Sequence, residues 1–471
     1  MNHVRLPLVV LASLLSITPP APAGGPGASI NALVADHAAK NPKAVVGLSV
    51  VDLRDGTKLA SLNETRLCTP ASNLKVFTSI FALTTLGGEA KFTTTAWLEG
   101  DALYVTGQFD PTLGDPNLAD AAQISVYAEL DRWAQALKTA TDGKGVRRLL
   151  LACGTPGTGY RHEDWSPAQY DSWYEAPVAA LNFQNNCIDV SFQVVSGVRQ
   201  TVVSPTGQFF HVNDQTRAGG KTAWQLKLSD NDATWTLTGT VSRSSTEPRH
   251  VPVNDPALFL GRVLADRIVR AGMPAPASLA VVSPTDKPAS AKAIASTVTP
   301  LATVMARANK RSLNMAAECM LLRTGDGTWA GSVRTMESVL TSTYHLPAGS
   351  MDLRDGSGLS KHNRVTPAAM TTLLAGVLER KDAKIFVESL PRAGVDGTLQ
   401  SRFKGKDKAV LGRIVAKTGF INNVHGLSGY VADKDGRLCV AFSILSNGPD
   451  SGARDLLEGV TTALVKWLDA K

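Results

Sequence analysis

Residues 70–88 read PASNLKVFTSIFALTTLGG, and this stretch decides how the chain folds. From residue 72 to residue 86 the sequence is mostly apolar, and a glycine pair follows, which predicts a buried helix that ends at the glycines. Ser72 and Lys75 lie three residues apart, so one face of this helix carries both side chains. We therefore expect a serine hydroxyl and a lysine amine to meet at the start of a buried helix.

This pairing is what an activated serine nucleophile requires. A serine hydroxyl attacks poorly unless a neighbouring base takes its proton, and the amine of Lys75 can do so only when it is uncharged. Burial or a nearby cation lowers the pKa of a lysine, and Lys417 can supply that cation together with a grip on a substrate carboxylate. Unpaired N–H groups at a helix start favour an oxyanion. We expect the N–H groups of Ser72 and of Phe420, on an edge strand, to form an oxyanion hole.

Two further strings complete a set of three motifs. Residues 312–314 (SLN) open another helical pattern, and residues 417–419 (KTG) precede the last predicted strands. In order, the three strings match the Ser-x-x-Lys, Ser-x-Asn and Lys-Thr-Gly motifs of penicillin-binding proteins and serine β-lactamases. Residues 401–404 also fit the first motif and residues 229–231 the second, but the former lie in a Gly- and Lys-rich loop and the latter resemble a hairpin turn.

Other catalytic schemes lack their residues. The eight histidines are scattered, with no His-x-His or i,i+4 pair to hold zinc. No Gly-x-Ser-x-Gly elbow is present, and no Gly-rich phosphate loop opens a helix. We expect no metal and no other cofactor. His425 lies near the third motif and either lines the cleft or is a hydrogen-bonded structural histidine.

The composition describes a soluble globular chain. Its 471 residues are enough for two or three domains with their own cores, and 44% hydrophobic with 19% charged residues is ordinary for such domains. The net charge of +7 is spread along the chain, whereas a nucleic-acid binder concentrates its cations on one face. We expect a diffusely basic surface suited to anionic polymers, and no nucleic acid as partner.

The first 23 residues have the pattern of an export signal. One cation precedes the short apolar run 6–17, two prolines follow, and Ala21-Pro22-Ala23 supplies small residues for cleavage. The run is too short to span a bilayer. We expect an exported, periplasmic or otherwise extracytoplasmic protein without a stable membrane anchor.

The five cysteines include no Cys-x-x-Cys pair, which disfavours a zinc ribbon or a redox motif. In an exported protein two of them can form a disulfide. Cys153 and Cys187 are the pair we expect, because both lie in one segment of the chain.

The predicted elements divide the chain into one interrupted domain. We expect an α/β catalytic domain built from residues 24–91 and 293–471, split by a β-rich insert over residues 92–292, of which 284–292 form the exit linker. In the insert a single helix is expected, with Asp255 as N-cap and Gly272 past its end. The other expected helices are 30–39, 300–308, 312–322, 367–378 and 456–468, and the expected strands are 45–53, 57–61, 102–106, 147–151, 188–195, 223–228, 234–241, 426–432 and 438–445.

The long gap between Lys75 and Ser312 discriminates among families with these motifs. It resembles the class C low-molecular-mass penicillin-binding proteins, the D-alanyl-D-alanine carboxypeptidase/endopeptidase family typified by penicillin-binding protein 4, which inserts extra domains there. Further stretches are similar to that family along nearly the whole mature chain: residues 107–113, 174–177, 180–182 with Asn186, 355–360, 394–399 and 427–430.

The resemblance implies a penicillin-recognising α/β fold, cleavage of peptidoglycan stem peptides and acylation by β-lactam antibiotics. By position, Ser72 is the acylated nucleophile and Lys75 its base. Ser312 relays a proton to the leaving amine, and Asn314 holds the substrate amide. Leu313 stands where the family usually has Asp, and we expect its side chain to point away from its neighbours with little harm.

The resemblance also implies the substrate-binding positions. Lys417 and Thr418 bind the terminal carboxylate, with Gly419 and Phe420 beside them. Lys361 stands where many relatives carry Arg, and at a site that grips the stem-peptide side chain a lysine loses bidentate binding. A solvated surface lysine is the alternative there.

Two other functions are compatible with parts of the pattern. A β-lactamase shares the acylation chemistry but needs a deacylating base, and no Glu-x-x-x-Asn signature for one is evident. A non-catalytic cell-wall-binding protein would use the insert to hold polymer or partner, and a broken motif would favour it, yet all three motifs are intact.

Overall fold

The computed structural model describes residues 25–196, 198–229, 232–403 and 408–471. The expected signal peptide, residues 1–23, lies outside this range, as does Lys404 of the second Ser-x-x-Lys string. None of the helices in the described ranges combines the length and the apolar character that crossing a bilayer needs.

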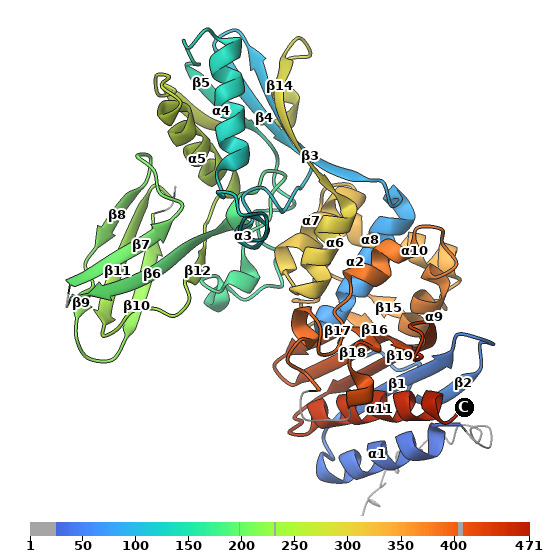
Figure 1. The fold of residues 1–471 in the computed structure, drawn as a ribbon. Coiled ribbons are helices and arrows are strands. Elements are labelled where there is room, and N and C mark those ends of the chain that lie inside the picture. The colour runs from blue at the N-terminus through green and yellow to red at the C-terminus, as the bar shows by residue number, and fades with distance from the viewer. Residues whose placement is uncertain (1–24, 197, 230–231, 404–407) are drawn as a thin grey trace, which may run out of the picture.

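Both ends of the chain build one antiparallel sheet with the strand order β17-β18-β19-β1-β2 (Figure 1). Its strands are β1 (Val45–Asp52), β2 (Lys58–Leu62), β17 (Ile414–Ile421), β18 (Val424–Ala432) and β19 (Leu438–Asn447). β1 pairs with β19 along its whole length, which joins the N-terminal hairpin to the C-terminal strands. The predicted α/β domain, assembled from both ends of the chain, is confirmed.

Helices cover both faces of this sheet, which explains why its central strands are buried throughout. On one face lie α1 (Gly27–Lys40) and α11 (Ala453–Asp469) (Figure 1). The helical block on the other side comprises α2 (Leu74–Leu86), α6 (Leu301–Lys310), α7 (Asn314–Thr324), α8 (Trp329–Tyr344), α9 (Pro367–Val377) and α10 (Ala383–Ser389). α2 is buried from Leu74 to Leu83 and ends at Gly87, whose φ of 77° suits glycine. It is the central helix that residues 70–88 predict.

The insert begins with a second five-stranded sheet, in the order β13-β5-β4-β3-β14. Its strands are β3 (Lys91–Glu99), β4 (Ala102–Gly107), β5 (Arg148–Ala152), β13 (Ser278–Val282) and β14 (Lys292–Pro300). β14 runs eight residues past the expected boundary at 292 and pairs with β3. The two strands thereby connect the insert to the helical block, since α6 starts directly after β14. The domain boundaries themselves stay a proposal.

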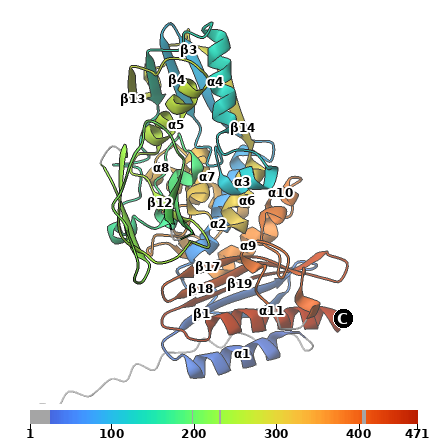
Figure 2. The ribbon, with the colours of Figure 1, turned by 60° about the vertical axis from the view of Figure 1, so that its left-hand side comes forward.

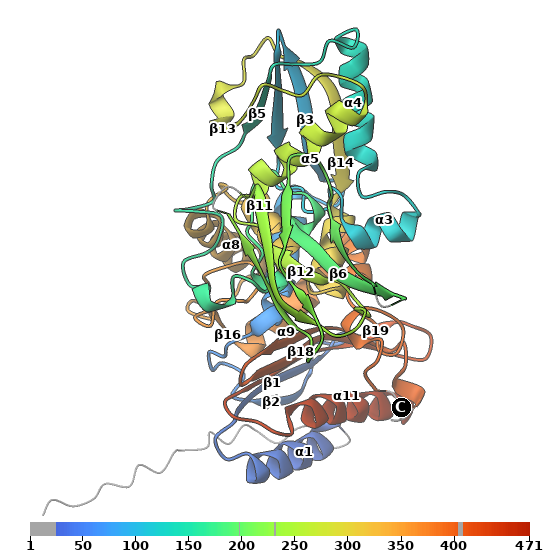
Figure 3. The same cartoon turned by 90° about the vertical axis from the view of Figure 1, so that its left-hand side faces the viewer.

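The remaining strands of the insert form two smaller sheets, β12-β6-β7 and β10-β11-β8, with β9 paired to β11. They stand beside the helical block, below the sheet that carries α4 (Ala128–Ala140) and α5 (Pro256–Arg270) (Figures 2 and 3). Their bounds are β6 (Cys187–Val195), β7 (Val198–Ser204), β8 (His211–Asp214), β9 (Arg217–Ala218), β10 (Ala223–Leu228), β11 (Thr234–Val241) and β12 (Arg249–Pro252).

The insert contains more helix than we expected. α5 (Pro256–Arg270) confirms the predicted helix. Asp255 is its N-cap as expected, since its carboxylate accepts from the N–H of Leu258. The structure adds α3 (Pro116–Ala122) and α4 (Ala128–Ala140), so the prediction of a single helix is wrong. The buried residues of α4, namely Leu130, Trp133, Ala134 and Leu137, follow the i, i+3, i+4, i+7 spacing of a helix packed by one face.

The expected disulfide is wrong as well. All five cysteines are free and buried. Cys153 follows β5, in the five-stranded sheet of the insert. Cys187 instead starts β6, in another sheet, where it lies opposite Pro252 of β12. Closeness in the sequence does not bring the two thiols together, since consecutive parts of the insert belong to different sheets.

Candidate active site

Ser72 lies in a short 3-10 turn, η1 (Ala71–Asn73), that leads into α2. Ser72 is partly exposed, whereas all the other residues from 68 to 83 are buried, so this turn brings Ser72 to the surface. Ala71 has a φ of 47°, a left-handed conformation that costs energy for alanine and sets the direction in which the chain enters the turn. Gly358 passes so close that a Cβ there would lie 1.9 Å from the Ala71 carbonyl oxygen.

The Lys75 amine meets three oxygens. Its Nζ lies 2.8 Å from Ser72 Oγ, 2.7 Å from Asn314 Oδ1 and 2.8 Å from the Ser357 carbonyl oxygen. The side chain is completely buried, and burial lowers the pKa of Lys75 to about 7, against the opposing charges of Glu318 and Asp355. A large share of this amine is therefore neutral near pH 7.

The second string places Ser312 and Asn314 at the start of α7. Ser312 has a φ of 57°, and Leu313 turns its side chain into the hydrophobic core, away from the polar groups, as expected. The Asn314 amide donates to the Tyr174 carbonyl at 2.8 Å while its oxygen faces Lys75. The asparagine thus connects Lys75 of α2 to a turn of the insert.

The third string lies on β17, the edge strand of the sheet. Lys417 Nζ donates to Ser312 Oγ at 3.0 Å and to the Thr418 carbonyl at 2.8 Å. Burial, together with the nearby charge of Lys75, holds the pKa of Lys417 well below its usual range. The Thr418 hydroxyl donates to that of Thr398 at 2.9 Å.

Two glycines let β17 pack against the turn that carries Ser72. Gly419 and Gly426 face each other across β17 and β18. A Cβ on Gly419 would lie 2.3 Å from Asn73 Nδ2 and 2.7 Å from the Pro70 carbonyl oxygen, and a Cβ on Gly426 would lie 2.2 Å from Asn73 Nδ2. Side chains at these positions are excluded, because the fully buried Asn73 fills the space.

The expected oxyanion hole is consistent with the strand's geometry. The N–H of Ala416 leaves β17 on its outer edge, where it donates to the Pro391 carbonyl at 3.0 Å. N–H groups alternate along a strand, so the N–H of Phe420, four residues on, points to the same edge. The Phe420 side chain is 68% exposed and its ring lies 5.1 Å from that of His425.

Three groups in this site lie outside the three motifs, and the motifs do not predict them. The Ser357 and Tyr174 carbonyls and the Thr398 hydroxyl all contact motif residues. They belong to the stretches 355–360, 174–177 and 394–399, which resemble the family but carried no assigned roles. Carbonyl groups occur in every residue, so a sequence pattern cannot single them out.

Lys361 lies apart from this cluster of contacts. It is exposed, and its carbonyl accepts from the Arg364 guanidinium at 2.6 Å. Its neighbour Ser360 donates to Asp164 of the insert at 2.6 Å. The exposure is compatible both with a grip on a stem peptide and with a surface lysine.

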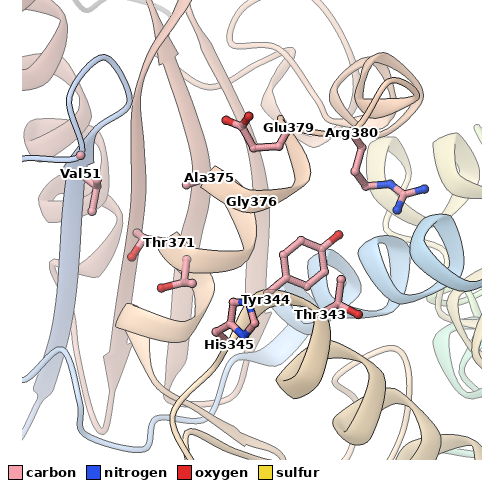
Figure 4. Close-up of a pocket in the computed structure, with 11 residues that line it drawn as sticks. Val51, Thr343, Tyr344, His345, Thr371, Ala375, Gly376, Glu379 and Arg380 are labelled. Carbon is pink, nitrogen blue, oxygen red and sulfur yellow. The ribbon is translucent and has the colours of Figure 1, made fainter.

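A cavity of about 630 Å³ lies elsewhere, where α9 meets β1 and the end of α8 (Figure 4). Tyr344, Thr371 and Arg380 are among its lining residues, and none of the three motifs contributes to its described lining. The chemistry predicted from the motifs therefore belongs to the surface around Ser72 and not to this cavity.

A serine within 2.8 Å of a buried lysine, beside an edge strand of an α/β fold, defines a serine acyl-enzyme hydrolase of the penicillin-recognising class. A family model described as the D-Ala-D-Ala carboxypeptidase 3 (S13) family matches residues 29–471, and the chain belongs to this family. It is thus a serine-type D-Ala-D-Ala carboxypeptidase.

Individual relatives cover most of the chain. A D-alanyl-D-alanine carboxypeptidase of Actinomadura sp. (strain R39) is 28% identical, with 89% of this chain and 80% of the relative covered. The D-alanyl-D-alanine carboxypeptidase DacB of Haemophilus influenzae is 24% identical over 90% of each chain. The crystal structure of H. influenzae penicillin-binding protein 4 matches the fold with a TM-score of 0.73 at 20% identity, covering 92% of this chain and 98% of that one.

Proposed function

We propose that this enzyme cleaves the D-alanyl-D-alanine end of peptidoglycan stem peptides through an acyl-enzyme on Ser72. The single observation that carries the proposal is the contact of 2.8 Å between Ser72 Oγ and a fully buried Lys75 Nζ. The same attack on a β-lactam ring gives a covalent adduct. A solved structure of H. influenzae penicillin-binding protein 4 in complex with a β-lactam, with a TM-score of 0.69, is in keeping with this.

The hydrogen bonds around Lys75 support its role as the base. A neutral amine has two N–H bonds and one lone pair. The Asn314 Oδ1 and Ser357 carbonyl oxygens can only accept, so they take the two N–H bonds. The lone pair is then left for the Ser72 hydroxyl, whose proton moves to Lys75 as Oγ attacks the penultimate D-alanine carbonyl.

The leaving group is handled from the other side of the cleft. As the tetrahedral intermediate collapses, the C–N bond breaks, and the departing amine takes the proton that Lys75 received from Ser72, relayed through the Ser312 hydroxyl that Lys417 holds by a hydrogen bond. Lys417 and Thr418 bind the terminal carboxylate, and the N–H groups of Ser72 and Phe420 stabilise the oxyanion. Lys75, neutral again, takes a proton from the water that attacks the ester and returns it to Ser72 Oγ as the ester C–O bond breaks.

Labelling with fluorescent penicillin, followed by mass analysis of peptides, tests the nucleophile. We expect one adduct, on Ser72, together with release of D-alanine from a stem pentapeptide, and loss of both in Ser72→Ala. Ser401→Ala, which alters the serine of the other Ser-x-x-Lys string, is the matched control and should keep both. An unchanged adduct on Ser72→Ala refutes the proposal, and rapid turnover of nitrocefin by the wild type indicates a β-lactamase.

The export signal is part of the same proposal. Peptidoglycan lies outside the cytoplasm, and residues 1–23 have the composition that secretion requires. The expected mature chain begins at Gly24. N-terminal sequencing of protein recovered from the extracytoplasmic fraction tests this, and a cytoplasmic protein that keeps residues 1–23 contradicts it.

A further inference from the structure

Glu318 is a buried carboxylate that the proposed chemistry does not use. It lies on α7 four residues after Asn314, so both side chains leave the same face of the helix. Its side chain is completely buried. Neither the Ser-x-Asn motif nor the acylation steps give it a role, yet a charged group held without water is costly unless it is fully hydrogen-bonded.

Three N–H groups satisfy this carboxylate. Oε1 accepts from the N–H of Ser357 at 2.7 Å, and Oε2 accepts from the N–H of Gly356 at 2.9 Å and from Trp329 Nε1 at 3.0 Å. All three partners are donors, which favours the ionised form of Glu318. Burial and the nearby Asp355 raise the pKa of Glu318 to about 7, while the three donors lower it.

The backbone of Ser357 lies between Glu318 and Lys75. Its N–H, in the peptide that follows Gly356, donates to Glu318, and its carbonyl, in the next peptide, accepts from Lys75 Nζ at 2.8 Å. Gly356 allows the loop to come this close, since a Cβ there would be 2.9 Å from Leu321 Cβ and 3.0 Å from the Ala317 carbonyl oxygen. The backbone conformation at Ser357, which joins these two peptides, therefore decides where one proton of the lysine amine points.

Asp355 holds the other side of the same loop. Its carboxylate accepts from the N–H groups of Gly358 at 2.9 Å and Ser360 at 2.7 Å, and from the side chains of Asn363 at 2.9 Å and Trp165 at 3.1 Å. The loop that carries the Ser357 carbonyl is thus fixed by two buried carboxylates, one on α7 and one of its own.

We propose that Glu318 is a positioning residue of the catalytic centre: it holds the backbone at Ser357 so that the Ser357 carbonyl stays on the Lys75 amine and the lone pair of the amine faces Ser72. α7 then controls both acceptors of the amine, directly through Asn314 and indirectly through Glu318. The inference rests on the proposed function, in which Lys75 is the base.

The charge of Glu318 has a second consequence. The ionisable groups that interact with it or with Lys75 include Asp355 on the loop, Lys417 on β17 and the buried thiol of Cys319 on α7. The negative charges of Glu318 and Asp355 raise the pKa of Lys75 against burial. Removing the charge of Glu318 therefore moves the deprotonation of Lys75 to lower pH, which a purely structural role elsewhere in the core does not do.

The test is the rate of acylation by fluorescent penicillin from pH 5 to 9, per folded enzyme, in Glu318→Gln. Glutamine keeps the shape but turns an N–H toward one of the backbone donors. We expect a plateau rate at least tenfold below wild type and a midpoint shifted to lower pH. Glu337→Gln is the matched control: its carboxylate also accepts a backbone N–H, that of Leu353 at 2.8 Å, but it has no hydrogen bond to the Ser357 backbone. Its plateau and midpoint should equal those of wild type.

A second variant keeps the proposal testable if Glu318→Gln does not fold. Trp329→Phe removes one of the three donors and leaves the carboxylate in place, so we expect a smaller loss, about threefold, with a midpoint shift in the same direction. A wild-type plateau and midpoint in either folded variant overturns the inference. Failure of the wild type to acquire an adduct on Ser72 instead overturns the proposed function, so the two failures are distinguishable.

Discussion

Replacing Gly419 by alanine should separate β17 from the nucleophile. The new Cβ would lie 2.3 Å from Asn73 Nδ2 and 2.7 Å from the Pro70 carbonyl oxygen. The Asn73 side chain is fully buried and has little room to move, and the Pro70 oxygen belongs to the backbone. The strand must therefore yield, and with it Lys417, Thr418 and the N–H of Phe420.

The size of the effect follows from the distance. An ordinary contact begins near 3.4 Å, so the strand and the turn must separate by about 1 Å from the 2.3 Å of the ideal position. A misplacement of about 1 Å in the reacting geometry can cost about 100-fold in rate, and loss of one oxyanion donor costs about 100- to 1000-fold. We expect the acylation rate of Gly419→Ala to fall about 100-fold.

The assay is the second-order rate constant for acylation by fluorescent penicillin, measured on enzyme shown by circular dichroism to be folded. Gly154→Ala is the matched control, because a Cβ on Gly154 meets no atom within 4 Å and its backbone needs no positive φ. A folded Gly419→Ala enzyme that acylates within about threefold of wild type would refute the reasoning, since β17 would then not form a wall of the site.

Two further predictions concern the lysine and the carboxylate subsite. In Lys75→Met, the free energy of unfolding should rise less steeply with pH. Between pH 7 and 10 the folded wild type binds fewer protons at Lys75 than the unfolded state, so Lys75 makes the free energy of unfolding rise with pH, with a slope that approaches about 1.4 kcal/mol per pH unit. Urea unfolding across this range measures the slope. The same slope in wild type and Lys75→Met contradicts the assigned burial of Lys75. In Thr398→Val, the Thr418 hydroxyl loses its partner, so we expect KM for a stem pentapeptide to rise about fivefold with kcat nearly unchanged, and steady-state kinetics that show an unaltered KM contradict the role of Thr398.

The local part of the site could be predicted because it depends on helical spacing. Ser72 and Lys75 share one face of α2 as the three-residue interval requires, and the ends of α2 follow from its apolar run and its glycines. Phe420 is expected on an edge strand, and β17, which contains it, is one. The sequence places Glu318 four residues after Asn314, but nothing local indicates that its carboxylate reaches a loop nearly forty residues away.

The disulfide and the bounds of β14 could not be predicted because they depend on tertiary contacts. Helix α4 differs, because its pattern is present in the sequence. The disulfide expected between Cys153 and Cys187 assumed that one segment forms one sheet, which the insert does not. The i, i+3, i+4, i+7 pattern of α4 was present in the sequence, but the neighbouring strand patterns dominated the interpretation. The extension of β14 past residue 292 is fixed by its pairing with β3, about 200 residues earlier.

The pH dependence of Ser72 acylation tests the neutral lysine most directly. Because burial lowers the pKa of Lys75 to about 7, the rate measured by mass spectrometry of the Ser72 adduct should rise about tenfold per pH unit below pH 6 and level off above pH 8. A rate that keeps rising toward pH 10, as an ordinary solvated lysine would give, or one that does not change between pH 5 and 8, would contradict a base that is uncharged in the resting enzyme.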